Sequence, residues 1–184
     1  MIKLREVKYC TLKDTSVQPP MPNDDFFYRP YIDDYQTLMI LDVMQGLYSE
    51  KGSPIRCFEY GSGWSTTFLS SFIPCIWISI DHHDFFIEML KGKLSINVTL
   101  VQKPIWSGYP EEIHIHGSKF DFVFVDGERR EDCIFEAHKA LRKGGIVVRH
   151  DAGLENEPIM HEGKDLRELF EENGVNAGLW WARK

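Results

Sequence analysis

Length, composition and charge exclude several classes of protein before any motif is considered. The chain has 184 residues, 43% of them hydrophobic, which suits a single domain with a sizeable core. Its net charge of -7 argues against a protein that holds nucleic acid mainly through phosphates, because such binding needs a clustered basic surface. No apolar run approaches the roughly 18 residues of a membrane-spanning helix. We therefore expect a soluble, cytoplasmic protein that binds neither nucleic acid nor membrane.

The N-terminal stretch resists assignment to regular structure. Four prolines between Pro19 and Pro30 interrupt a run of aromatic residues that extends from Phe26 to Tyr31. We interpret residues 1–32 as an arm or lid of the single domain and residues 33–184 as its α/β core. The arm is either a surface strap or a lid that contacts substrate.

Helical and extended patterns alternate through the core. The predicted strands are Cys57 to Tyr60, Cys75 to Ile80, Ile96 to Val101, Phe120 to Val125, Ile146 to Arg149 and Val175 to Ala182. The predicted helices are Asp33 to Tyr48, Thr66 to Phe72, Asp84 to Lys91, Arg130 to Leu141 and Lys164 to Glu172. This alternation predicts a Rossmann-like, doubly wound α/β fold with a mostly parallel sheet and helices on both faces. Only one clear strand follows the fifth, so we expect a sheet trimmed at its C-terminal end or one further weak strand.

The stretch from Phe58 to Thr67 predicts a strand, a glycine turn and a helix, with a ligand on the turn. A dinucleotide fingerprint would have a third glycine where this chain has Thr66. Glu59 precedes Gly61 by two residues, and a carboxylate there would repel phosphates and suit a cationic ligand such as S-adenosylmethionine. Asp81 ends the next strand. Its separation in sequence from Gly61 is the one at which an acidic side chain reaches a ribose diol in such folds, and both dinucleotides and S-adenosylmethionine contain that diol.

The chain resembles class I S-adenosylmethionine-dependent methyltransferases in three motifs. These are Glu59-x-Gly61-x-Gly63-x-Ser65-Thr66, Ile80-Asp81-His82 and Phe124-Val125-Asp126-Gly127. It is also similar to metal-assisted small-molecule O-methyltransferases through Val125-Asp126-Gly127 and the segment from Gly144 to Asp151. The resemblance, which covers about Cys57 to Asp151, implies that the cofactor-binding residues are Glu59, Gly61, Gly63, Ser65, Asp81, His82 and Asp126.

The same resemblance implies a catalytic group made of Asp126, His150 and Asp151. Asp126 and Asp151 would bind Mg²⁺ or another divalent cation, and His150 would be the reserve general base. Catechol-type enzymes have a further asparagine ligand where this chain has Ala152.

Structural roles compete with each of these assignments. Either aspartate could turn the chain or cap a helix. His150 could be a core histidine, and its side chain should point away from that of Asp151 if the strand continues through both residues. The charged run from Glu128 to Asp132 is interpreted as a solvated helix start that pairs with itself.

The sequence thus predicts a methyltransferase that transfers the methyl group of S-adenosylmethionine to a hydroxyl on a small molecule such as a sugar or phenol. The alternatives are an NAD(P)-dependent oxidoreductase and a non-catalytic binding module that keeps the fold. Whether the chain forms a homo-oligomer or part of a larger enzyme is left open.

Overall fold

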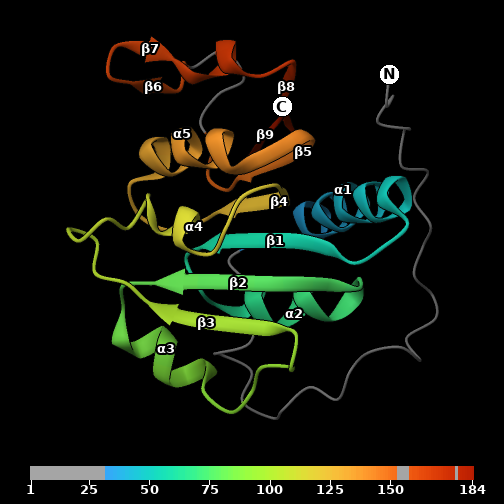
Figure 1. Cartoon of the computed structure of the whole chain (residues 1–184), viewed down its shortest axis with the longest axis vertical. Helices are drawn as coiled ribbons and strands as arrows, with labels where there is room; N and C mark the ends of the chain where they lie inside the picture. Colours follow the sequence, from blue (N-terminus) through green and yellow to red (C-terminus); the bar gives the residue numbers. More distant parts are fainter. Residues whose placement is uncertain (1–31, 153–157, 177) are drawn as a thin grey trace.

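A seven-stranded sheet lies at the centre of the structure, a computed structural model that describes residues 32–152, 158–176 and 178–184. Its strand order is β3-β2-β1-β4-β5-β9-β8 (Figure 1). Neighbouring strands are parallel from β3 to β5, whereas β9 is antiparallel to both β5 and β8. The strands are β1 (Ile55–Tyr60), β2 (Cys75–Asp81), β3 (Val98–Gln102), β4 (Phe120–Val125), β5 (Leu141–Arg149), β8 (Glu172–Asn176) and β9 (Leu179–Arg183). The predicted Rossmann-like fold is confirmed.

Helices cover both faces of this sheet. They are α1 (Asp34–Lys51), α2 (Trp64–Phe72), α3 (Asp84–Leu90), α4 (Glu112–Ile115) and α5 (Arg130–Ala140), with a 3-10 helix, η2 (Leu166–Leu169). Apolar residues of α1 and α2, such as Met44 and Leu69, pack in one core cluster with Phe122 and Phe124 of β4. Residues of α5 and η2 pack in a second cluster with the alternate residues of the same strands, such as Val123. The central strands are buried on both faces, which explains why β4 is apolar at every position except Asp121.

Local signals set the ends of α1. Asp33 caps its first turn, because its side chain accepts the amide of Gln36 while the Gln36 side chain accepts the amide of Asp33. Gly52, at φ +66°, ends the helix in the left-handed conformation and donates its N–H to Tyr48 O. The predicted start of this helix is therefore confirmed, and the helix ends three residues after the predicted Tyr48.

The C-terminal region differs from the prediction. The segment from Lys164 to Glu172, predicted to be one helix, instead contains β7 (Lys164–Asp165), η2 and the first residue of β8. The predicted single strand from Val175 to Ala182 is a β8–β9 hairpin that turns at Gly178, at φ +78°. Of the two alternatives, a further weak strand is confirmed and a trimmed sheet is wrong, because β8 completes the sheet at its edge. The sequence did not locate β8, because an edge strand buries little side chain and Glu172–Asn176 carries no apolar alternation.

Two further features complete the described chain. A two-stranded sheet of β6 (Met160–His161) and β7 lies against α5. No helix within the described ranges is both long and apolar enough to cross a membrane.

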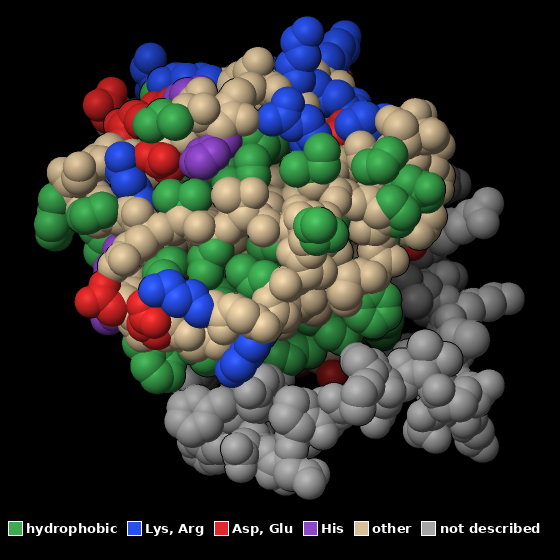
Figure 2. Space-filling model, turned by 60° about the horizontal axis from the view of Figure 1, so that its bottom comes forward, with side chains coloured by type: hydrophobic (Ala, Val, Ile, Leu, Met, Phe, Trp, Pro, Cys, Tyr) green, Lys and Arg blue, Asp and Glu red, His purple; other side chains and the backbone are tan. Residues whose placement is uncertain are grey.

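On the face shown in Figure 2, hydrophobic side chains are scattered among polar ones, and Lys and Arg gather along the upper margin. The predicted arm, residues 1–32, lies outside the described residues except for Ile32. That residue is buried in the core cluster that also contains Met44 and Leu69.

Candidate functional site

The carboxyl ends of β1, β2, β4 and β5 meet at one edge of the sheet. Backbone hydrogen bonds extend the pairing into the loops, from Gly61 N to Ile80 O (2.9 Å), Asp126 N to Tyr60 O (2.8 Å) and His150 N to Val125 O (3.0 Å). The residues that follow these strands are therefore held side by side, although they are far apart in the sequence. The site residues predicted from the sequence lie in β1, at the last position of β2, in these loops or at the start of α2.

The two glycines of the first turn have different surroundings. Gly61 has φ +93°, and a Cβ there would lie 2.6 Å from Gly127 N and 2.8 Å from Asp126 O. The turns after β1 and β4 thus pack directly on each other, and the fold itself requires Gly61. Gly63 has an extended φ of -175°, and a Cβ there would meet no atom of the described residues within 4 Å. Open space therefore lies beside Gly63, at the start of α2.

Glu59 is fully buried beneath this turn and accepts four hydrogen bonds. The donors are Ser65 Oγ (2.5 Å), Thr66 Oγ1 (2.7 Å), Ser79 Oγ (2.7 Å) and Trp77 Nε1 (2.9 Å). Burial raises the pKa of Glu59 to about 7, even though the four hydrogen bonds favour the charged form. In this structure Glu59 and Ser65 bind each other and join β1, β2 and α2. Direct contact of either residue with a cofactor stays a prediction.

Asp81 lies at the end of β2 with its side chain almost wholly buried. Its Oδ2 accepts the amide of Ser62 (2.8 Å) and its Oδ1 accepts the amide of His83 (2.7 Å). Each oxygen keeps a second lone pair, because a carboxylate offers about four acceptor sites. The carboxylate is thus held rigidly against the glycine turn and can still accept from a ligand.

Two buried polar atoms close to Asp81 have no hydrogen-bond partner among the described residues. They are His82 Nδ1, which is 3.6 Å from Asp81 Oδ1, and the hydroxyl of Tyr109. The rings of His82 and Tyr109 lie 6.3 Å apart, edge to face. Unpaired buried polar groups cost free energy, so both are candidates to bind a ligand or water. The sequence predicted His82 but missed Tyr109, which belongs to an irregular loop and carried no motif.

Asp126, His150 and Asp151 converge at the ends of β4 and β5. His150 Nδ1 is 2.8 Å from Asp126 Oδ1, and His150 Nε2 is 3.6 Å from Asp151 Oδ1. His150 and Asp151 were expected to point apart if the strand continued through them, and that condition is not met. β5 ends at Arg149 and Asp151 has φ +51°, so the alternation of a strand does not continue to these residues. Burial lowers the pKa of His150, but Asp126 and Asp151 outweigh it and the pKa lies above its usual value.

One ligand atom from each of these three residues lies within 4.8 Å of the others, as a bound divalent cation would require. The guanidinium of Arg130 already contacts both carboxylates, however. Its Nη1 is 3.2 Å from Asp151 Oδ2, and its Nη2 is 3.5 Å from Asp126 Oδ1. The sequence interpretation of Arg130 as a solvated, self-paired residue was therefore wrong, whereas Arg129 does pair with Asp132 as expected (2.7 Å).

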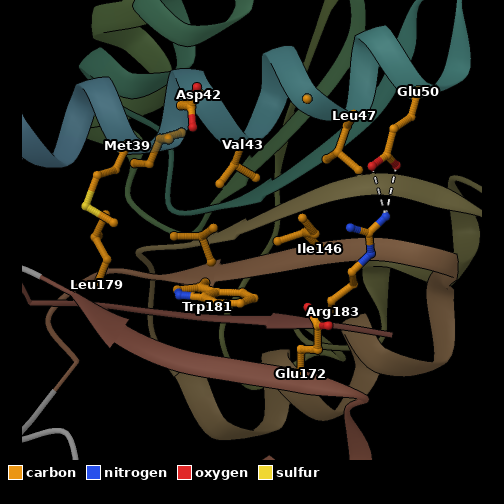
Figure 3. A pocket seen from close by; sticks show the side chains of 13 residues that line it. Met39, Asp42, Val43, Leu47, Glu50, Ile146, Glu172, Leu179, Trp181 and Arg183 are labelled. Carbon is orange, nitrogen blue, oxygen red and sulfur yellow. Dashed lines mark hydrogen bonds and ion pairs between the residues drawn. The ribbon is translucent and has the colours of Figure 1, made fainter. Parts of the chain in front are cut away.

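An apolar cavity of about 60 Å³ lies elsewhere, between α1 and strands β5 and β9 (Figure 3). Val43, Leu47, Ile146 and Trp181 line it, and an ion pair between Glu50 and Arg183 lies at one end. None of the site residues predicted from the sequence lines this cavity. It is therefore separate from the site at the strand ends.

Comparisons with known proteins bear on the fold. Neither known protein-family models nor curated proteins match the chain. Among solved structures, the methyltransferase MycE of the mycinamycin biosynthetic pathway, in complex with Mg and SAH, matches 82% of this chain at 17% identity and a TM-score of 0.58. The chain spans 47% of that protein, or about half its length.

Two further structures match over more of their own length. A methyltransferase-like protein from Silicibacter pomeroyi matches at 16% identity and a TM-score of 0.56, over 76% of this chain and 84% of that one. A precorrin 8W decarboxylase from Methanobacterium thermoautotrophicum matches at 17% identity and a TM-score of 0.56, over 90% and 100%. At such identities the likeness shows the fold alone: this chain has the Rossmann-like fold of class I methyltransferases.

Proposed function

We propose that the protein is an S-adenosylmethionine-dependent methyltransferase that acts on a hydroxyl of a small molecule. The observation that carries the proposal is the open space beside Gly63, next to the rigid and incompletely paired carboxylate of Asp81. Neither the packing nor the backbone conformation calls for glycine at position 63, so a ligand is the best physical reason for that space. The MycE structures, which contain SAH, support the choice of cofactor.

The predicted cofactor contacts can be divided by what their side chains already bind. Asp81, His82 and Gly63 have free acceptors or free space, so we propose that they meet the cofactor directly. Gly61, Glu59 and Ser65 are committed to the packing of the turn, so we propose that they shape the site beneath the cofactor. Tyr109 is added to the site because its hydroxyl is buried without a partner in the described part of the chain.

The chemistry at the ends of β4 and β5 suits removal of a hydroxyl proton. S-adenosylmethionine, when bound, supplies a methyl group on a positively charged sulfur. Transfer of that methyl group to a hydroxyl oxygen would require a base that takes the hydroxyl proton. His150 can accept it at Nε2, because Nδ1 is held by Asp126 (2.8 Å) and Nε2 is the remaining ring nitrogen. Asp126 would orient the ring and stabilise its charged form.

The sequence also predicts that a divalent metal ion assists this reaction. Asp126 and Asp151 converge as a metal site needs, and the two MycE structures are complexes with Mg. The third converging donor is an imidazole nitrogen, however, and Mg²⁺ prefers oxygen ligands. The Arg130 guanidinium also occupies the same carboxylates, so the residues present do not fit a metal ion well.

The fold alone leaves the reaction open. Spermidine synthase from Thermotoga maritima also matches, with a TM-score of 0.53 and 16% identity over 83% of this chain and 60% of that one, and the precorrin 8W decarboxylase has a similar fold. A pKa of about 7 also leaves Glu59 partly neutral at neutral pH, which weakens the argument that it repels phosphates. A direct binding experiment is therefore required.

Calorimetry on the full chain with S-adenosylhomocysteine, S-adenosylmethionine and NAD tests the proposal. We expect both adenosyl compounds to bind and NAD to give no heat. Asp81→Asn should weaken binding of S-adenosylhomocysteine about tenfold or more, because a charged acceptor for a ribose hydroxyl is lost. Asp42→Asn, on the exposed face of α1, is the matched control and should change nothing.

Different outcomes identify different alternatives. Binding of NAD without any response to the adenosyl compounds would favour the oxidoreductase. If none of the three bound, the non-catalytic module would be favoured. Transfer of a labelled methyl group to a panel of sugars and phenols, with and without EDTA, then tests the acceptor and the metal-assisted form.

A further inference from the structure

We propose that Arg130 is the resident cation of the Asp126–Asp151 site and holds the place that a divalent metal would take. The Asp126 carboxylate lies at the end of β4, that of Asp151 follows β5, and the guanidinium lies between them. It contacts Asp151 Oδ2 through both terminal nitrogens, at 3.2 and 3.3 Å, and approaches Asp126 Oδ1 to 3.5 Å. One cationic side chain thus serves both carboxylates that the sequence assigned to a metal.

Backbone contacts fix the guanidinium in this position. Arg130 Nε donates to Gly127 O (3.0 Å), and its Nη1 donates to His150 O (3.0 Å). These carbonyls belong to the loops after β4 and β5, so the side chain ties both loops together. A guanidinium is planar, always charged and rich in donors, and it can satisfy two carbonyls and two carboxylates at once. The side chains of Arg130 and Asp126 are only 24% and 23% exposed, so solvent screens their contact incompletely, whereas the Asp151 side chain is 65% exposed and its contact is screened more.

A metal ion would have to displace these contacts. A divalent cation binds carboxylate oxygens at about 2.0–2.6 Å, depending on the metal. Such an ion between Asp126 and Asp151 would lie beside the positive charge of Arg130 and would be repelled by it. It would also compete with the hydrogen bond that Asp126 Oδ1 makes to His150 Nδ1 (2.8 Å). The present contacts therefore favour the guanidinium over a metal.

The adjacent arginine shows that this arrangement is specific to one side chain. Arg129 Nε donates to Asp132 (2.8 Å) and its Nη1 to Ile105 O (3.4 Å), so it points away from the strand ends. Arg129 and Arg130 carry the same charge and differ by one position in the sequence. Arg129→Gln is therefore a matched control for Arg130→Gln.

This inference rests on the proposed function only for the role that Arg130 would have in the reaction. In a methyltransferase, Arg130 would be a positioning residue that holds Asp151 and the loop of His150. The test itself measures metal binding and needs neither cofactor nor acceptor.

Electron paramagnetic resonance of Mn²⁺ with the full-length protein provides that test, because the signal of free aqueous Mn²⁺ is lost on binding. We expect the wild-type protein and Arg129→Gln to leave the signal unchanged. Arg130→Gln should gain Mn²⁺ affinity by about tenfold or more, because the positive charge that repels the ion is removed and both carboxylates are released. Adding Asp151→Asn should remove the gain, and Arg130→Lys, which restores a cation, should exclude Mn²⁺ again.

Two results would overturn the proposal: Mn²⁺ binding by the wild-type protein as tight as by Arg130→Gln, or no gain in an Arg130→Gln protein with native circular dichroism. If that variant does not fold, the melting temperature of the wild-type protein with and without Mn²⁺ tests the proposal instead. A rise of its melting temperature with Mn²⁺ that Asp151→Asn abolishes would contradict the proposal, and no rise would support it. Failure of S-adenosylhomocysteine to bind would count against the proposed function and leave the Arg130 result standing.

Discussion

Gly61 and Gly63 are two residues apart in one turn and have different surroundings. Gly61 has a positive φ and lies against the backbone of Asp126 and Gly127, so a side chain there would collide with the turn after β4. Gly63 has an extended φ and open space where a side chain would begin. A glycine-rich motif can therefore contain one glycine that serves the fold and one that leaves room for a ligand.

This difference predicts opposite effects of the same substitution. Gly63→Ala should change the free energy of unfolding by less than about 1 kcal/mol, because the new methyl group meets no protein atom. It should nevertheless weaken S-adenosylhomocysteine binding about tenfold or more, since the methyl occupies the proposed cofactor space. Calorimetry and urea unfolding measure the two effects.

Gly61→Ala is the control, with an expected loss of about 3 kcal/mol or more of stability from strain and backbone overlap. Unimpaired ligand binding by Gly63→Ala would refute the assignment of the space to a cofactor.

At the scale of elements, local sequence signals fix the ends of α1, and tertiary packing sets the surroundings of its middle. Its capping box and its left-handed glycine cap are local and fix both ends of the helix. Gly46, in the middle of the helix, lines the apolar cavity of Figure 3, and a Cβ there would meet nothing within 4 Å. The helix therefore carries a glycine that neither its backbone nor its packing requires.

Gly46→Ala should stabilise the protein by about 0.5–1 kcal/mol, because alanine loses less backbone entropy than glycine in a helix. Gly52→Ala is the matched comparison, since its Cβ would also meet nothing within 4 Å while its φ is +66°. We expect this variant to lose about 1–2 kcal/mol from left-handed strain alone. Thermal or urea unfolding measures both, and a loss of stability in Gly46→Ala would show that the cavity needs to stay open.

At the scale of the whole molecule, two buried carboxylates connect several elements and have opposite pKa shifts. Burial raises the pKa of Glu59, which links β1, β2 and α2, to about 7. Burial also acts to raise the pKa of Asp121, but hydrogen bonds from Lys51 (2.7 Å), Arg142 (2.5 Å) and the amide of Arg56 (2.7 Å) lower it below its usual value. Asp121 thereby joins α1, β1, β4 and β5.

The two shifts affect stability in different pH ranges. A carboxyl with a raised pKa binds more protons in the folded than in the unfolded state, so its contribution is complete below the usual 4.5 and is lost as pH rises to about 7. A carboxyl with a lowered pKa contributes above the usual 3.8, and its contribution is lost as pH falls below that value. The Glu59 and Asp121 ranges therefore do not overlap.

We expect the free energy of unfolding to fall by on the order of 3 kcal/mol as pH rises from 4.5 to 7 through Glu59 alone. Urea unfolding at several pH values in this range measures the change. His150, whose pKa is also raised, would act in the same direction near neutral pH, so Glu59→Gln is needed to isolate the Glu59 contribution. An equal slope in that variant would show that Glu59 is not responsible.

The sequence by itself determined the order of the strands and of α1, α2, α3 and α5 as far as β5, because strands buried on both faces are apolar throughout and helix ends carry caps and glycines. The short helix α4, which has 4 residues, was not predicted. The sequence also determined which residues stand at the strand ends, since each motif follows directly on a strand. The β8–β9 hairpin could not be predicted in the same way. β8 is an edge strand held mainly by backbone pairing with β9, and such pairing leaves little trace in side-chain pattern.

Only the tertiary structure decided what each side chain at those ends contacts. Glu59 is enclosed by four donors from two other elements, Tyr109 reaches the site from a loop without a motif, and Arg130 lies between two carboxylates of separate strands. The physical reason is that parallel strands bring distant loops to one edge, where burial and charge depend on all of them at once. Local sequence names the residues of the glycine turn, and the packing of the neighbouring turns decides which of them are free to meet a ligand.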